Sequence, residues 1–268
     1  MFQALDHGRH CLVHRAVHAR FPTDARYAGI QGVDFGDPMR LDVLQHRRLV
    51  LADALGAGKL VLMHVVPRLP LEALTSILER TPLETEQQLL DAAYARFGRI
   101  DVLINNAGTN PVTAGLSDLT PDLFQKVFEV NTKGPWYLAS RAAPRMAQHG
   151  GGSIINVISV GGLKPSAYQG FYAATKAALQ ALTKVMAAEW AQMGIRVNAL
   201  APGSYHSDMF DKSAAVLPGF TEGSIAATLQ KRIADTDEIL GPVMYLASDM
   251  SSYTTGTTLI ADGGYLVL

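Results

Sequence analysis

Apolar and polar residues alternate along the last two thirds of the chain in a pattern typical of strands that alternate with helices. Glu86–Phe97 has the periodicity of an amphipathic helix, and Gly98 follows it as a stop signal. Val102–Ile104 is a short continuous apolar run, as expected of a strand buried on both faces. Thr120 precedes Pro121, a pair that favours the N-cap and the first position of the next helix.

The same alternation continues to the end of the sequence. Glycines 150–152 interrupt the helix that begins after Thr120. The elements predicted after them are a strand at Ser153–Ile158, a helix at Tyr172–Gln192, a strand at Ile195–Leu200, a helix at Asp237–Ser248 and a strand at Thr257–Ile260. Helices that connect successive strands imply parallel βαβ units. We therefore predict a single α/β domain over residues 1–268, built as a doubly wound, Rossmann-like parallel sheet flanked by helices.

The first 80 residues depart from this pattern. They hold nine of the fifteen arginines and six of the eight histidines of the chain, but only one lysine. Leu49–Ala52 and Leu60–Met63 are candidate strands, and Leu71–Glu79 is a candidate short helix or strand. We treat residues 1–80 as an atypical part of the domain and residues 86–268 as its regular part.

Composition excludes several classes of function. A net charge of −1 gives no electrostatic footprint for nucleic acid or for an anionic membrane. Cys11 is the only cysteine, which excludes an internal disulfide and suits a reducing compartment. The longest apolar run, Leu60–Val66, is too short to span a bilayer, and the first twenty residues have no apolar core of a signal peptide. We expect a cytoplasmic protein and assign it no metal site.

Three residues have the spacing that a proton relay needs. Tyr172 and Lys176 are four residues apart, so both lie on one face of a helix. A phenol with a pKa near ~10 is a poor acid or base at neutral pH, and a nearby ammonium group is expected to lower that pKa. Ser159 precedes Tyr172 by thirteen residues and follows a predicted strand, from where its hydroxyl can hold a substrate oxygen.

Several further motifs resemble the short-chain dehydrogenase/reductase family. They are Asn105-Asn106-Ala107-Gly108, Asn131, Ser159, Tyr172-x-x-x-Lys176, Pro202-Gly203 and Asp262-Gly263-Gly264. The resemblance covers about residue 86 to the C-terminus, and its motifs stand at the family's mutual spacing. It implies an oxidoreductase that uses NAD or NADP to interconvert a small secondary alcohol and a ketone, of sugar-acid or 3-oxoacyl type.

The resemblance also implies roles for single residues. Tyr172 would be the general acid/base, Lys176 would lower its pKa and bind the nicotinamide ribose, and Ser159 would position the substrate oxygen. Asn131 would distort its helix and hold a water of the proton relay. Cofactor contacts are implied for Asn105, Ala107, Gly108, Tyr172, Lys176, Pro202, Gly203 and Ser207, the last in the place of a usual threonine.

Substrate contacts and assembly are less sharply indicated. By their place in the sequence, Gln169, Tyr205 and Met209 are candidate substrate contacts, whereas we give His206 no role in the chemistry. Lys164 follows Ser159 in a loop and is read as a solvated surface residue. Alanines along the helix of Tyr172 favour close packing, which in the family joins symmetry mates, so a homodimer or homotetramer is expected.

The family's phosphate-binding signature, Thr-Gly-x-x-x-Gly-x-Gly after the first strand, does not occur in this chain. Gly56-Ala57-Gly58 is the nearest match and is a weak one. Glu79 stands at the spacing of the acidic residue that meets adenine, but Arg80 follows where a valine is usual. The residues that would distinguish NAD from NADP therefore lie in the atypical segment.

Three explanations of the atypical segment stay open. Residues 1–80 form an altered lobe that binds the cofactor differently or not at all, or their reading frame has shifted. Back-translating Gly8–Arg15 and moving the reading frame forward by one nucleotide permits a sequence similar to the family's first strand and first glycine. The same shift does not restore the middle glycine of the signature. Third, the chain is a relic or a regulatory member that kept the core of the fold and lost the dinucleotide. The alternative function is thus a cofactor-free or cofactor-impaired protein of the same fold, acting as a binding module or a non-redox enzyme.

The missing glycine loop predicts weak cofactor binding. A dinucleotide gains much of its affinity where glycine-loop N–H groups meet the pyrophosphate. We expect this chain to bind NADH and NADPH more weakly than an intact family member by about 2–4 kcal/mol, the loss of two or more charge-assisted hydrogen bonds. Isothermal titration with both cofactors measures this. Sub-micromolar binding of either one would mean that residues 1–80 contain a working phosphate site.

Overall fold

A computed structural model describes residues 48–52, 61–65, 82–111, 115–167 and 169–268 of the chain. At 48–52, 61–65, 82–85, 92 and 96 it describes the backbone alone. The predictions made for Leu71–Glu79, for Gly56-Ala57-Gly58 and for Arg80 lie outside the described residues.

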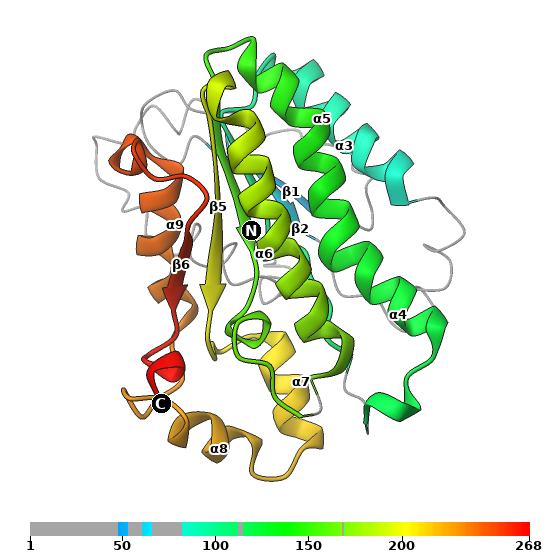
Figure 1. The fold of residues 1–268 in the computed structure, drawn as a ribbon, viewed down its shortest axis with the longest axis vertical. Helices are drawn as coiled ribbons and strands as arrows, with labels where there is room; N and C mark the ends of the chain where they lie inside the picture. Colours follow the sequence, from blue (N-terminus) through cyan, green and yellow to red (C-terminus); the bar gives the residue numbers. More distant parts are fainter. Residues whose placement is uncertain (1–47, 53–60, 66–81, 112–114, 168) are drawn as a thin grey trace, which may run out of the picture.

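Six described strands form one sheet, in which each strand pairs with the next along the chain (Figure 1). The strands are β1 (Arg48–Ala52), β2 (Val61–Val65), β3 (Val102–Asn105), β4 (Gly152–Val157), β5 (Ile195–Pro202) and β6 (Thr258–Ala261). From β2 to β6 all pairings are parallel, which confirms the predicted parallel sheet. The prediction is wrong for β1, which runs antiparallel to β2. Only residues 53–60 connect these two strands, and a parallel crossover needs a dozen or more.

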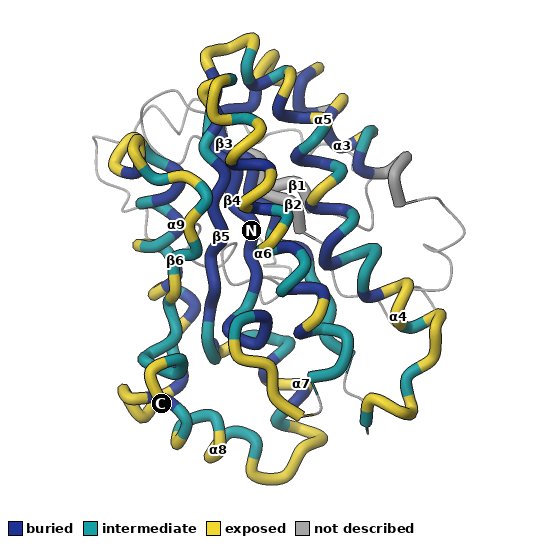
Figure 2. The backbone as a smooth tube through the Cα atoms, in the orientation of Figure 1, coloured by how far each residue is buried: buried dark blue, intermediate teal, exposed yellow. Residues whose placement is uncertain are grey.

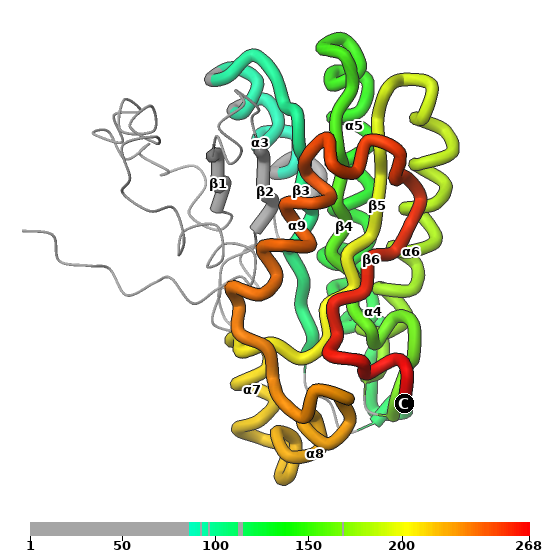
Figure 3. The backbone as a smooth tube through the Cα atoms, turned by 90° about the vertical axis from the view of Figure 1, so that its left-hand side faces the viewer, coloured from blue at the N-terminus to red at the C-terminus, as the bar shows by residue number. Residues whose placement is uncertain are grey.

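Helices cover both faces of this sheet. The described α-helices are α3 (Pro82–Phe97), α4 (Pro121–Phe128), α5 (Gly134–Ala147), α6 (Gly170–Trp190), α7 (Asp208–Val216), α8 (Phe220–Ala226) and α9 (Leu240–Ala247). Short 3-10 turns occupy Leu116–Asp118, Val160–Gly162, Ala191–Met193, Thr236–Ile239, Asp249–Ser251 and Tyr265–Val267, and a π turn occupies Glu129–Lys133. The turned view places α5 and α6 on one side of the sheet and α9 on the other (Figure 3).

The central strands are buried on both faces (Figure 2). In β4, Ile154 packs with Leu103 and Leu138 in the cluster beneath α3, α5 and α6. Its neighbour Ile155 points the other way, into the cluster beneath α9 that contains Val243. Successive side chains of a strand point to opposite faces, so a strand with helices on both sides is apolar throughout. The continuous apolar runs of the sequence have this cause.

The predicted helices from residue 86 onward are confirmed, with two additions. The helix that begins at Pro121, with the Thr120 hydroxyl accepting from the Leu123 N–H, passes through the π turn Glu129–Lys133 before continuing as α5. Helices α7 and α8 were not predicted. Their sequences are short and polar, and α8 contains Gly223, so neither shows a helical apolar stripe of useful length.

The carboxyl ends of the parallel strands point toward one end of the molecule, where α7 and α8 lie (Figure 1). In open α/β sheets this edge is where ligands bind. In the part of the chain that the structure describes, no helix is long and apolar enough to cross a membrane.

The turn between α5 and β4 supplies a stability prediction. Gly150 and Gly151 both have a positive φ, of 92° and 94°, which costs any other residue roughly 1–2 kcal/mol. A Cβ on Gly151 would clash with the Gly194 carbonyl oxygen, whereas one on Gly150 would meet nothing within 4 Å. Gly151→Ala should therefore lower the free energy of unfolding by at least about 2 kcal/mol more than Gly150→Ala. Equal losses in urea denaturation would contradict this packing.

Candidate active site

A cavity of about 240 Å³ opens at the carboxyl ends of β3, β4 and β5. Most of the site residues predicted from the sequence line it, which are Ala107, Gly108, Ser159, Gln169, Tyr172, Lys176, Pro202, Gly203, Tyr205, Ser207 and Met209. Asn105 and Asn131 do not line it. The strands bring residues from four separate segments of the chain to this edge of the sheet.

Ser159 and Tyr172 both line the cavity, and the Ser159 hydroxyl lies close enough to the Tyr172 phenol to affect its pKa. Ser159 follows β4 and caps the turn Val160–Gly162, where its Oγ accepts from the Gly161 N–H at 3.1 Å. Burial raises the pKa of Tyr172, and the hydrogen bond from Ser159 opposes that rise. The sequence-based expectation of a lowered phenol pKa is therefore wrong for the protein without bound ligand, because desolvation of the phenolate outweighs the other effects.

Lys176 lies one helical turn from Tyr172, and its side chain is buried. Its Nζ donates to the Val157 carbonyl oxygen at 2.8 Å and lies 5.8 Å from the centre of the Tyr172 ring. Burial lowers the pKa of Lys176 from 10.5 to about 8. The amine is thus held at the cavity wall in a state that is readily deprotonated, with N–H groups left to meet a ligand.

Asn131 is fully buried in the π turn and joins three elements. Its Oδ1 accepts from the Thr109 N–H at 2.8 Å, and its Nδ2 donates to the Thr109 carbonyl at 2.9 Å. Nδ2 also donates to the Thr175 hydroxyl at 3.0 Å, on the helix that carries Tyr172. Its side chain therefore ties the segment after β3 to α6. The relay water predicted for Asn131 stays a prediction.

Asn105 belongs to the interior of the sheet rather than to the cavity. It is fully buried, and its Nδ2 donates to the Pro135 carbonyl at 3.2 Å and to Asn156 Oδ1 at 2.9 Å. The contact with cofactor predicted for Asn105 is not supported by this placement. Within the same motif, Gly108 does face the site, because a Cβ there would lie 3.2 Å from Lys176 Nζ.

The segment after β5 forms another wall of the cavity. Gly203 packs against Asp262, and a Cβ on Gly203 would lie 2.8 Å from the Asp262 Cα. Ser207 caps α7, its Oγ accepting from the Phe210 N–H at 3.3 Å. Since a hydroxyl has a proton to donate as well, Ser207 can still give a hydrogen bond to a ligand.

The three candidate substrate contacts do not behave alike. Gln169 and Met209 line the cavity from the start of α6 and the first turn of α7. Tyr205 is buried, and its hydroxyl donates to the Ala261 carbonyl at 3.2 Å. Tyr205 packs in the core beneath α9 as well as lining the cavity, and its substrate contact stays a prediction.

Sequence reasoning missed several lining residues. They are Asn106, Asn110, Val157, Ile158, Val160, Ser204, Asp208, Phe210, Ser213 and Phe220. Asn106 and Asn110 could have been found, because they follow a predicted strand at its carboxyl end. Phe210, Ser213 and Phe220 come from α7 and α8, which the apolar pattern did not reveal.

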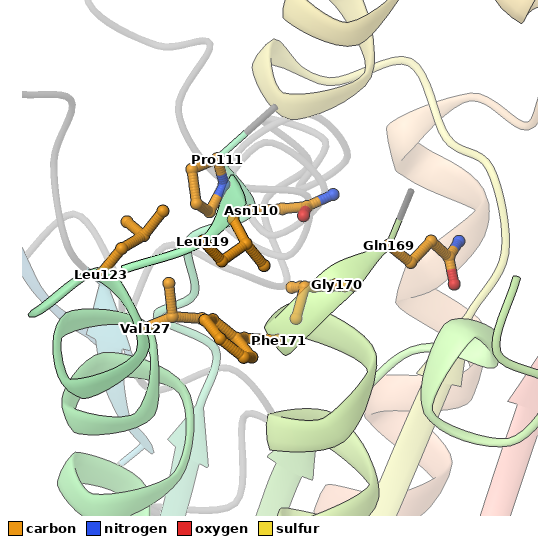
Figure 4. Close-up of a pocket in the computed structure, with 9 residues that line it drawn as sticks. Asn110, Pro111, Leu119, Leu123, Val127, Gln169, Gly170 and Phe171 are labelled. Carbon is orange, nitrogen blue, oxygen red and sulfur yellow. The ribbon is translucent and has the colours of Figure 1, made fainter. Parts of the chain in front are cut away.

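A smaller notch opens beside Tyr172 on the side of α4 (Figure 4). Its volume is about 10 Å³, close to the space that one water molecule or methyl group needs. Apolar side chains form most of its wall, which are Pro111, Leu119, Leu123, Val127 and Phe171. Asn110, Gln169 and Tyr172 line both the notch and the main cavity, so the two spaces adjoin.

Comparisons with known proteins agree with this geometry. Residues 80–266 match a family profile described as enoyl-(acyl carrier protein) reductase. The chain is 34% identical over 212 residues to an L-rhamnose 1-dehydrogenase (NAD(P)(+)) of Azotobacter vinelandii. The aligned region covers 79% of this chain and 82% of that protein. It is 38% identical over 184 residues to dehydrogenase/reductase SDR family member 4 of Bos taurus, covering 68% of this chain and 65% of that protein.

The extent of the matches varies among relatives. An uncharacterized short-chain type dehydrogenase/reductase of Sinorhizobium fredii is 39% identical over 175 residues, yet the match spans 64% of this chain and only 31% of that protein. Among solved structures, a gluconate 5-dehydrogenase of Burkholderia cenocepacia in complex with NADP and tartrate has a TM-score of 0.65 and 35% identity. That similarity covers 68% of this chain and 71% of the other.

The buried amine of Lys176 predicts a pH-dependent stability. Between about pH 8 and 10.5 the folded protein binds fewer protons than the unfolded chain, so the cost of the buried charge disappears as pH rises. Relative to Lys176→Met, the wild type should gain about 2 kcal/mol of unfolding free energy between about pH 7.5 and about pH 9.5. Urea denaturation of both proteins measures this. A difference that stays constant with pH would place the amine in solvent.

Proposed function

Because the chain belongs to the short-chain dehydrogenase/reductase family, we propose that it interconverts a small secondary alcohol and a ketone with NAD or NADP as the hydride carrier. The observation that carries the proposal is the meeting of Ser159, Tyr172 and Lys176 in the wall of one cavity, with the Lys176 Nζ 5.8 Å from the centre of the Tyr172 ring. A phenol and a serine hydroxyl side by side can both reach one substrate oxygen. This is the arrangement that proton transfer to a carbonyl requires.

Each residue has a defined task in this scheme. The protonated phenol of Tyr172, whose pKa burial raises, donates its proton to the carbonyl oxygen in reduction and takes it back in oxidation. Ser159 holds the same oxygen by a hydrogen bond. Lys176 lies one turn along α6, close enough to favour the phenolate once the proton has left. Its amine then passes a proton from solvent back to the phenolate.

The residues present fit the nicotinamide half of the cofactor. Gly108 lets the chain pass directly beside the Lys176 amine, leaving a cradle that any Cβ would fill. Lys176 and Ser207 offer donors for a ribose hydroxyl and a carboxamide oxygen. When bound, the nicotinamide supplies or accepts the hydride. The choice between NAD and NADP rests with residues before 82 and is left open.

We also propose that Asn131 supports the relay from its place in the π turn. Thr109 and Thr175 take both Nδ2 hydrogens, and Oδ1 accepts one bond, so a water would be held by the second lone pair of Oδ1 or by backbone groups of the π turn. A π turn interrupts the regular backbone hydrogen bonds of the helix, and backbone groups freed in this way are what holding a relay water requires.

A second candidate function is a cofactor-free protein of the same fold. The absence of a glycine-rich signature from the sequence favours it. The retention of Lys176, Asn131 and Ser207 argues against it, and two of them, Lys176 and Ser207, line the cavity.

Removing the Tyr172 hydroxyl tests the proposal. Tyr172→Phe deletes the proton donor at the reacting oxygen and one hydrogen bond, so turnover of any substrate should fall by about 10²–10⁴-fold while stability changes by about 1 kcal/mol. The assay is oxidation of NADH or NADPH with a carbonyl substrate. Tyr245→Phe is the matched control, because that hydroxyl meets Thr254 at 2.9 Å outside the cavity. Wild-type turnover by Tyr172→Phe would exclude the assignment.

A further inference from the structure

The cavity is poor in positive charge. Among its lining residues in the described part of the chain, only Lys176 and Asp208 carry a formal charge, and Asp208 is an acid. The other polar groups of the wall are neutral amides and hydroxyls, including those of Asn110, Gln169 and Ser204. Apart from Lys176, which the proposed function assigns to the cofactor and the phenol, no described lining residue is a cation that could receive an anionic group of a substrate, so moving such a group out of water would be costly.

The two lysines nearest the reacting groups in the sequence are both engaged by backbone. Lys176 is buried and donates to the Val157 carbonyl at 2.8 Å. Lys164, five residues after Ser159, donates to the Leu268 carbonyl at 2.7 Å and lies 5.1 Å from the centre of the Tyr265 ring. Lys164 is exposed, as expected of a solvated surface residue, and it also contacts the segment after β6. It does not line the cavity.

The apolar notch gives the site a size limit on one side of Tyr172. Its walls come from α4, from the loop before it and from Phe171, whose ring packs edge-on against Phe124 at 4.8 Å. That packing fixes the notch at about the size of a methyl group. Because Tyr172 lines both the notch and the larger cavity, a carbonyl group that meets its phenol would have one substituent toward the notch and the other toward the larger cavity.

We propose that the substrate is a neutral ketone, or its alcohol, that carries a methyl-sized group on one side of the carbonyl and a larger uncharged group on the other. The inference rests on the proposed function and narrows it. Of the two substrate types suggested by the sequence, a free sugar acid is disfavoured by the lack of a free cation in the described wall, and neutral carbonyl compounds are favoured.

Methyl acetoacetate and acetoacetate form the first test, because they share a methyl ketone and differ by one negative charge. We expect kcat/KM for the ester to exceed that for the anion by at least about 10-fold, since the anion must be desolvated without a partner. Met209→Lys adds a cation to the wall and should reduce the preference for the ester, whereas Met209→Gln, of similar length and neutral, should preserve it. An anion that is the better substrate of the wild type would overturn the inference.

The size of the notch is tested with esters whose ketone carries a methyl, ethyl or propyl group. The wild type should lose at least about 10-fold in kcat/KM from methyl to propyl. Leu119→Ala removes three carbons from the notch wall and should lessen that loss, whereas Leu116→Ala, at a side chain 65% exposed and outside the notch, should not. Equal kcat/KM values of the wild type for all three esters would show that the notch does not limit the size of the substrate.

Ligand-observed NMR separates this inference from the proposed function, because binding needs no turnover. Methyl acetoacetate should bind wild-type protein and acetoacetate should not, with Met209→Lys gaining binding of the anion. If neither probe is reduced but the ester alone binds, the redox proposal fails and the neutral-site inference holds. If acetoacetate binds as well as the ester, the inference fails even when both are reduced.

Discussion

The site depends on one buried amide. Asn131 is fully enclosed in the π turn between α4 and α5, and its three hydrogen bonds join the segment after β3 to α6. A buried amide that lost these partners would cost about 1–3 kcal/mol, so the three elements are held together as a unit. The Thr132 hydroxyl strengthens the junction by donating to the Thr175 carbonyl at 2.9 Å. The position of α6 relative to the sheet follows from it.

The chemistry follows from the position of α6. That helix carries Tyr172 and Lys176 into a cavity formed by the strand ends. Burial there raises the pKa of Tyr172 and lowers the pKa of Lys176, so it favours the neutral form of each side chain. Burial therefore favours a protonated phenol beside a readily deprotonated amine. The same burial makes the cavity intolerant of unpaired charge, which links the catalytic arrangement to the neutral substrate that we propose.

The sequence predicted the family and the elements from residue 86 onward, because buried parallel strands and capped helices leave strong local signals, and both predictions are confirmed. It placed Ser159, Tyr172 and Lys176 together through helix and strand geometry. It gave no sign of the buried hydrogen bonds of Asn105 and Tyr205, because nothing local shows the tertiary direction of a side chain. The direction of the Tyr172 pKa was missed because desolvation depends on the surrounding fold.

A double-mutant cycle tests most directly whether the Asn131 junction holds the site together. Asn131→Ala and Thr175→Val each remove one side of the hydrogen bond between Nδ2 and Oγ1, which is 3.0 Å long. The measured quantity is the free energy of unfolding of the wild type, both single variants and the double variant. A coupling energy of about 1–2 kcal/mol is predicted, because the two groups act in one buried network. Losses that add within about 0.5 kcal/mol would contradict the account.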